Sequence, residues 1–123
     1  MMALRATGCP WMRGGVSEMA RFEVFRNSSS HADDVPYLLD VQSDLLNGLE
    51  TRVVIPLRRC DRFSVSRIPQ RLTPVFKIEG IDCMLETPKL AAVPLRLLKQ
   101  PVHSLAAEQT VITGALDFLF QGF

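Results

Sequence analysis

Most apolar residues in this chain fall in short runs with the length of β-strands, and helical spacing appears only near the C-terminus. Runs rich in β-branched and aromatic residues occur at Phe22–Phe25, Leu38–Val41, Arg52–Leu57 and Val75–Ile78. No helical segment separates successive runs, so a βαβ arrangement is excluded. We therefore expect an α+β fold, mostly antiparallel β, in which the strands of a small barrel are closed by one C-terminal helix.

Turn residues indicate how these strands connect. Asn47-Gly48 is a strong turn signal, because both residues tolerate positive φ. Val75–Ile78 and Asp82–Leu85 are expected to pair as a hairpin across Glu79-Gly80-Ile81. Pro56 has no backbone N–H, which predicts an edge position or a bulge for its strand.

The C-terminal segment has the pattern of an amphipathic helix. After a last strand expected at Pro94–Leu98, Ser104 is a good N-cap and Gly122 a natural helix terminator. The residues between them predict a helix of about four turns. Its apolar stripe comprises Leu105, Ile112, Ala115, Leu116 and Leu119.

Length and composition narrow the class of protein. A chain of 123 residues is one domain, and a formal net charge of +1 creates no strong field toward nucleic acid or anionic membranes. No apolar run approaches the roughly 20 residues of a membrane-spanning helix. The three cysteines, Cys9, Cys60 and Cys83, have no zinc-site spacing, which favours reduced thiols in a cytosolic protein. We expect no metal and no cofactor.

Residues 1–18 differ from the rest of the chain. They show little periodicity and lack the apolar region of a signal peptide. The codons for Arg13-Gly14-Gly15 can contain a ribosome-binding sequence at a suitable distance upstream of a start codon at Met19. We expect residues 1–18 to be a non-native or disordered extension, and residues 19–123 to be the functional domain.

The chain offers little catalytic chemistry. Phosphate-binding glycine loops are absent, and neither His31 nor His103 lies in a recognised nucleophile motif. Asp40 and Asp44 occupy alternating positions and could form a carboxylate pair, although carboxylates near turns usually cap backbone N–H groups. No catalytic residue is assigned. A small ribonuclease is the enzyme alternative, and it requires a histidine, an arginine and a carboxylate to converge.

Two features favour binding to a partner. Leu45 and Leu46 are apolar where a turn is normally polar, and as neighbours on a regular strand they could not both enter one core. The chain end is also unusually apolar, with phenylalanines at 118, 120 and 123, and it either packs into the core or forms a contact surface.

The connection expected at Arg58–Arg71 is irregular or partly helical and rich in arginine. Its five arginines face one carboxylate, Asp61. They form either a solvated face or a docking site for an acidic partner segment, which bidentate arginine–carboxylate pairs would hold.

From Arg21 to Phe123 the sequence resembles the CcdB family of bacterial toxins. The specific signals are DVQSDLL at Asp40–Leu46 and RVVIPL at Arg52–Leu57. Weaker matches are PVFKI at Pro74–Ile78, the AxVP pattern of Ala91–Pro94 and the terminal helix that ends at Gly122 plus an apolar residue.

The resemblance implies a cytoplasmic homodimer of SH3-like barrels, each with a C-terminal helix. It implies the toxin of a type II toxin–antitoxin module, of the kind that maintains plasmids. Such a toxin binds the GyrA-type chain of DNA gyrase, which carries the DNA-cleaving site, and traps the gyrase–DNA cleavage complex without being an enzyme. A CcdA-like antitoxin neutralises it, and the two repress their own operon, with DNA contacted only through the antitoxin.

The resemblance also implies which residues form the sites. The gyrase-binding positions fall on Leu45, Leu46, Asp117, Gln121, Gly122 and Phe123. Arg58, Arg59 and Arg62 are the candidates for antitoxin binding. Gln121 stands where the best-known toxin has a tryptophan that stacks on a gyrase arginine, and Asp117 replaces an asparagine. Besides a ribonuclease toxin, a decayed toxin that only binds antitoxin is therefore an alternative.

Overall fold

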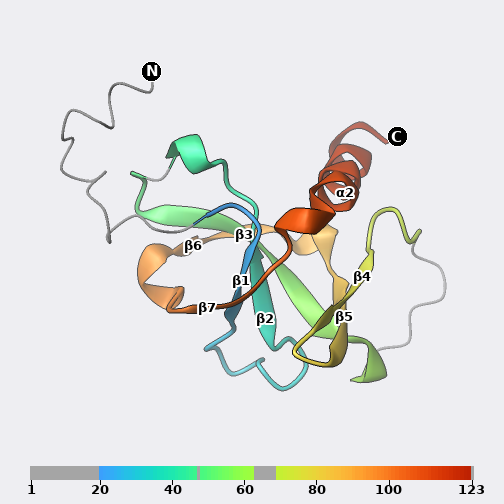
Figure 1. The fold of residues 1–123 in the computed structure, drawn as a ribbon, viewed down its shortest axis with the longest axis horizontal. Coiled ribbons are helices and arrows are strands. Elements are labelled where there is room, and N and C mark those ends of the chain that lie inside the picture. The colour runs from blue at the N-terminus through green and yellow to red at the C-terminus, as the bar shows by residue number, and fades with distance from the viewer. Residues whose placement is uncertain (1–19, 47, 63–68, 123) are drawn as a thin grey trace.

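The computed structural model describes residues 20–46, 48–62 and 69–122, and it shows a curled antiparallel sheet with one C-terminal helix (Figure 1). Six strands follow the order β4-β5-β3-β2-β1-β7, and a seventh, β6, pairs with β3. The sheet curls into a half-barrel, which confirms the expected SH3-like barrel closed by a helix. The extension expected at residues 1–18 lies outside the described residues.

The elements are short, as the apolar runs predict. The strands are β1 Glu23–Arg26, β2 Tyr37–Asp40, β3 Thr51–Arg59, β4 Val75–Ile78, β5 Ile81–Leu85, β6 Ala91–Pro94 and β7 Pro101–Ser104. The helix α2 covers Gln109–Gln121. Short 3₁₀ turns lie between them: η2 Asp44–Leu46, η3 Cys60–Arg62, η4 Thr87–Lys89, η5 Leu95–Leu97 and η6 Ala106–Glu108.

β3 is the central strand, so the edge position predicted from Pro56 is wrong. On one side β3 pairs with β2, and on the other it pairs with β6 through Val54 and then with β5 from Leu57. The carbonyl of Pro56 accepts the N–H of Glu86 at 2.9 Å on this second side. Because a strand residue directs its N and C=O to the same side, the missing N–H of Pro56 faces the change of partner, where no ladder bond is lost.

The hairpin between β4 and β5 is confirmed, with Glu79 and Gly80 as its two turn residues. Both have positive φ, 52° and 84°, as a two-residue turn of the primed types requires. Tyr37 Oη donates a 2.6 Å hydrogen bond to Glu79 Oε1, and Arg26 Nη2 donates at 3.0 Å to Oε2. These bonds tie the hairpin turn to β1 and β2.

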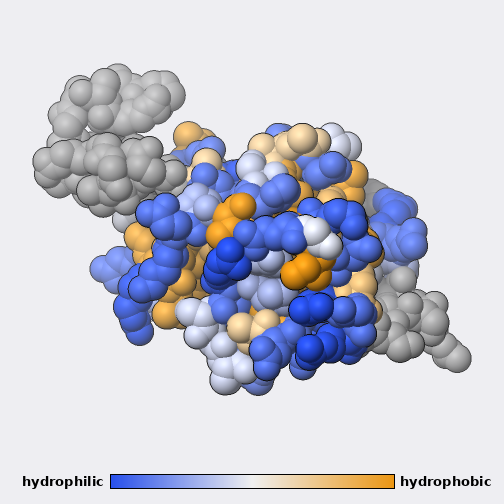
Figure 2. Space-filling view, turned by 60° about the horizontal axis from the view of Figure 1, so that its bottom comes forward, coloured by the Kyte–Doolittle hydropathy of each residue, from blue (hydrophilic) through white to orange (hydrophobic). Residues whose placement is uncertain are grey.

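The main core lies between the concave side of the sheet and α2. Leu105, Ile112 and Ala115 of the predicted stripe are buried there. A smaller cluster of Phe25, Val54 and Leu98 is also buried. The face turned forward in Figure 2 is largely hydrophilic, with apolar residues in separate groups.

Three predicted boundaries are wrong. β1 begins at Glu23 because Phe22 has φ +73°, outside the β region. The last predicted strand ends at Pro94, and the segment Leu95–Leu97 is a 3₁₀ turn, whereas β7 was not predicted. Ser104 Oγ accepts the N–H of Ala106 at 3.2 Å, so it caps η6, and α2 begins only at Gln109. Gly122 ends α2 in the left-handed conformation, as predicted.

Candidate interaction surface

The segment Asp40–Leu46 leaves the sheet at the end of β2 and forms the turn η2. At its start Asp40 and Arg52 are both fully buried and face each other across β2 and β3. Arg52 Nε donates to Asp40 Oδ2 at 2.9 Å, and Arg52 Nη2 lies 2.7 Å from the same oxygen. Burial raises the pKa of Asp40, while the hydrogen bonds from Arg52 and from the N–H of Gln42 act in the opposite direction. The predicted pairing of Asp40 with Asp44 as catalytic carboxylates is therefore wrong.

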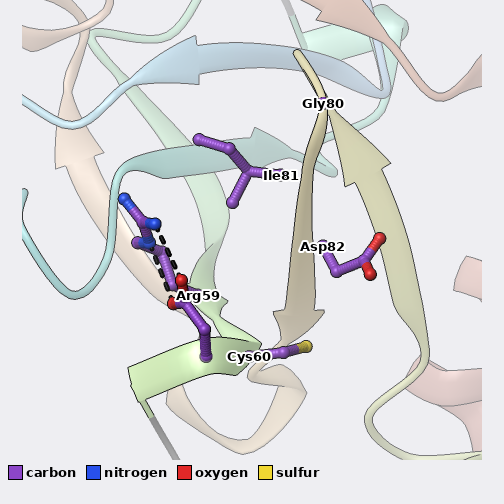
Figure 3. A pocket seen from close by; sticks show the side chains of 6 residues that line it. Arg59, Cys60, Gly80, Ile81 and Asp82 are labelled. Carbon is purple, nitrogen blue, oxygen red and sulfur yellow. Dashed lines mark hydrogen bonds and ion pairs between the residues drawn. The ribbon is translucent and has the colours of Figure 1, made fainter.

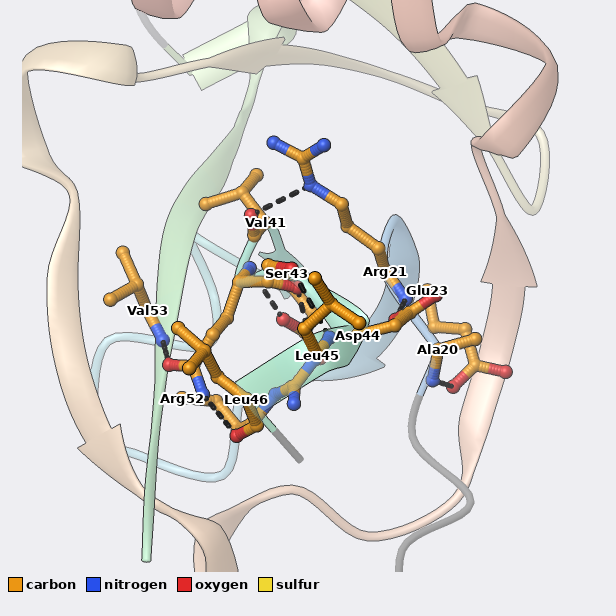
Figure 4. Close-up of polar contacts among 12 residues, drawn as sticks. Ala20, Arg21, Glu23, Val41, Ser43, Asp44, Leu45, Leu46, Arg52 and Val53 are labelled. Carbon is orange, nitrogen blue, oxygen red and sulfur yellow. Dashed lines mark hydrogen bonds and ion pairs between the residues drawn. The ribbon is translucent and has the colours of Figure 1, made fainter. Parts of the chain in front are cut away.

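The other polar side chains of this segment stabilise the turn itself (Figure 4). Asp44 Oδ1 accepts the N–H of Arg21 at 2.7 Å, and Arg21 Nε donates to the carbonyl of Val41 at 3.0 Å. Ser43 Oγ accepts the N–H of Leu45 at 3.1 Å. Carboxylates and hydroxyls next to a turn commonly bind backbone groups in this way. The polar residues of DVQSDLL thus hold a 3₁₀ turn of defined shape.

This turn directs its two leucines outward. Leu45 is 84% exposed and Leu46 48% exposed. The prediction that at least one of them lies outside the core is confirmed, and both do. Exposed leucines on a turn that is held by buried polar groups are a ready contact for a partner.

The second group of predicted contact residues lies on the outward face of α2. Asp117 and Gln121, one turn apart, are exposed, as is Gly122. Asp117 borders a shallow hollow of about 370 Å³ formed beside Thr110, Thr113 and Gly114. Phe123 lies outside the described residues.

The phenylalanines near the chain end have different surroundings. Phe120 is 71% exposed, whereas Phe118 is partly buried and has the guanidinium carbon of Arg71 at 5.0 Å from its ring centroid. The expectation that the end packs into the core or forms a surface thus resolves into both, one ring for each.

The two groups of candidate contact residues are separate within one chain. The main contacts of α2 among the turns are with η4 and η6 rather than with η2. In Figure 1 the green η2 turn and the red α2 both lie at the top, on opposite sides of the view. One protomer therefore presents two patches.

Each of the three candidate antitoxin-binding arginines has a carboxylate partner in the chain. Arg58 Nε donates to Glu86 at 2.9 Å, Arg59 makes two bonds to Asp61 at 3.0 and 2.8 Å, and Arg62 lies 3.2 Å from Asp34. Arg58 and Arg59 belong to β3 rather than to the irregular connection predicted for them. Residues 63–68 of that connection lie outside the described residues.

A shallow pocket of about 380 Å³ adjoins the Arg59–Asp61 pair (Figure 3). Its other walls are Cys60, Gly80, Ile81 and Asp82. Burial raises the pKa of the Cys60 thiol, and nearby Asp82 and Asp61 raise it further. This cysteine is therefore not an activated nucleophile.

The histidine, arginine and carboxylate that the ribonuclease alternative requires do occur together. His31, Arg58 and Glu86 border a pocket of about 440 Å³, whose remaining walls include the apolar Leu38, Val93 and Leu97. Glu86 already binds Arg58, and His31 lies on an exposed loop.

Metal and membrane signals can be assessed over the same residues. Within 20–46, 48–62 and 69–122, no three histidine, cysteine or acidic side chains form a group able to hold a metal ion. None of the helices described in the structure has the length and apolar character needed to cross a membrane.

The curled half-barrel with its C-terminal helix places the chain among small SH3-like barrel proteins. The model of one family, described as CcdB protein, matches residues 21–122. The match spans most of the chain, which therefore belongs to the CcdB family. Members of this family are in general toxins of toxin–antitoxin modules and poison DNA gyrase, rather than enzymes themselves.

Proposed function

We propose that this protein is a toxin that binds the GyrA chain of DNA gyrase and traps the gyrase–DNA cleavage complex. The observation that carries the proposal is the exposed Leu45–Leu46 turn, which buried polar side chains hold in place in a chain of the CcdB family. Poisoning of this kind needs no catalytic residue. It follows from tighter binding to the cleaved state of gyrase than to its other states, which shifts the population toward that state. The action takes place in the cytoplasm, where gyrase meets DNA.

The gyrase-binding surface would consist of Leu45, Leu46, Asp117, Gln121, Gly122 and Phe123. The turn and the helix end form separate patches within one chain. A homodimer supports their use as one surface, because a twofold axis duplicates each patch and can place those of two protomers side by side.

The antitoxin would bind through Arg58, Arg59 and Arg62. Two of these ion pairs are well exposed, with side-chain exposures of 30% and 61% for Arg59–Asp61 and of 50% and 54% for Arg62–Asp34. Such pairs stabilise a fold by only about 0–1 kcal/mol, so carboxylates of a partner can replace the internal ones at little cost. The antitoxin would also supply the DNA contacts through which the complex represses its operon.

Purified protein tests the main proposal. Incubation with gyrase, supercoiled DNA and ATP should accumulate double-strand breaks that a protein denaturant reveals, and expression without antitoxin should arrest growth. Unchanged gyrase turnover, no breaks and normal growth would refute the poison hypothesis. Antitoxin binding without any of these effects would instead identify a decayed toxin.

The pocket bordered by His31, Arg58 and Glu86 favours a ribonuclease as the second candidate. Histidine can move a proton while arginine holds a phosphate. Cellular RNA incubated with the protein should then be cleaved, and His31→Ala should abolish the cleavage. Intact RNA after prolonged incubation removes this candidate.

We further propose that residues 19–123 form the toxin domain and that translation begins at Met19. N-terminal sequencing of the protein from its natural host tests this, and a chain that begins at Met1 or Met2 refutes it.

A further inference from the structure

Gln42 makes hydrogen bonds with every polar group that it has. Its N–H donates to Asp40 Oδ1 at 3.0 Å, and its carbonyl accepts from Arg52 Nη2 at 3.2 Å. In the side chain, Oε1 accepts the N–H of Val53 at 3.0 Å and Nε2 donates to the carbonyl of Leu46 at 3.0 Å. The residue is only 7% exposed. Full satisfaction of a buried amide indicates that its orientation is fixed.

The amide of Gln42 takes the position of a peptide group in the β2–β3 ladder. The N–H of Val41 donates to the carbonyl of Val53 at 3.0 Å, and an antiparallel ladder would return a bond from the N–H of Val53 to the carbonyl of Val41. That carbonyl instead accepts from Arg21 Nε, and the N–H of Val53 donates to Gln42 Oε1. The side chain therefore continues the ladder where the main chain leaves the sheet.

The other end of the same amide holds the contact turn. Nε2 of Gln42 binds the carbonyl of Leu46, the last residue of η2. A planar amide transmits a fixed geometry from Val53, in the central strand, to the exposed leucines. We propose that Gln42 is a positioning residue, which sets the presentation of Leu45 and Leu46 to the partner. This rests on the proposed function for the identity of the partner, the GyrA chain of gyrase, but not for the effect on the turn.

Substitutions at Gln42 separate its two hydrogen bonds. Gln42→Met has a similar shape and lacks both bonds, whereas Gln42→Glu keeps an acceptor for Val53 and lacks the donor to Leu46. Ile112→Val, in the core beneath α2, is the matched control, because it lowers stability without contacting the turn. Gln42→Asn, which retains the amide chemistry, replaces Gln42→Met if the latter does not fold.

Amide hydrogen exchange and gyrase binding are measured on the same samples of the full chain. Gln42→Met should speed exchange at Val53 and across Ser43–Leu49, and should weaken GyrA binding by about tenfold. Gln42→Glu should speed exchange in the turn while Val53 stays protected. Ile112→Val should leave turn exchange and affinity unchanged at an equal loss of thermal stability.

Two outcomes would overturn the inference. The first is wild-type exchange across the turn in Gln42→Met, and the second is faster exchange with unaltered gyrase affinity. If wild-type protein does not bind GyrA at all, the proposed function fails, while the exchange data still decide whether Gln42 holds the turn.

Discussion

Arg52 contacts Asp40 through two nitrogen atoms, Nε at 2.9 Å and Nη2 at 2.7 Å, and neither side chain is more than 1% exposed. The pair joins the end of β2 to β3 where the contact turn begins. Removing one partner of a buried pair leaves a charge without compensation, which costs about 3–5 kcal/mol.

Asp40→Asn should therefore lower the free energy of unfolding by about 3 kcal/mol or more, measured by urea denaturation. The double variant Asp40→Asn, Arg52→Met should lose less than the sum of the two single losses, because no buried charge then remains unpaired. Strictly additive losses would show that the two side chains do not stabilise each other.

Leu45→Ser should change binding without changing the fold. With 84% of Leu45 exposed, the free energy of unfolding should stay within about 0.5 kcal/mol of wild type. Affinity for GyrA should fall by about tenfold or more, as for a central apolar contact. Val75→Ser on β4, where Val75 is 51% exposed, is the control and should bind normally. Equal affinity of all three proteins would remove the turn from the interface.

Gln121→Trp should strengthen gyrase binding. A tryptophan at this exposed position adds an aromatic face for a cation, a contact of about 0.5–2 kcal/mol. Gln121→Leu adds apolar area without that face and should gain less. Calorimetry at several salt concentrations measures the difference, and no gain over Gln121→Leu would exclude a cation at this position.

Stability should decline above pH 9 because two groups hold their protons more tightly in the folded state. Burial raises the pKa of Cys83 from 9.0 to about 11. Burial and the hydrogen bond to Glu79 raise the pKa of Tyr37 from 10.0 to about 12. A raised folded pKa gives stability that is complete below the unfolded pKa and is lost as the pH rises through the folded value.

Tyr37→Phe should remove the Tyr37 part of this decline. Its unfolding free energy should fall less steeply than that of wild type between pH 10 and 12, while the decline from Cys83 between pH 9 and 11 remains. Denaturation at a series of pH values checks this. Identical slopes in the two proteins would show that the Tyr37 hydroxyl does not titrate with folding.

Arg59→Ala together with Arg62→Ala should weaken antitoxin binding by about tenfold at low salt, with little change in stability. The difference should shrink as salt screens the charges. Arg96→Ala, at another exposed arginine, is the control. A loss that does not depend on salt would point to packing rather than to charge.

Local patterns were sufficient to predict the sheet, the hairpin and the family. The turn residues Glu79-Gly80 and the β-branched run in β3 favour one backbone conformation by themselves. The beginning of α2 was not predictable in this way, because Ser104 can cap either an α-helix or the 3₁₀ turn η6, and tertiary packing selects the turn.

The sequence by itself determined that Leu45 and Leu46 are out of place in an ordinary turn and that DVQSDLL marks the family. Only the tertiary structure showed why that motif is polar around two leucines. Asp40 meets Arg52, Asp44 meets Arg21, and Gln42 meets both Val53 and Leu46. These partners lie up to 23 residues apart, and hydrogen bonds between distant residues form only when the sheet brings them together.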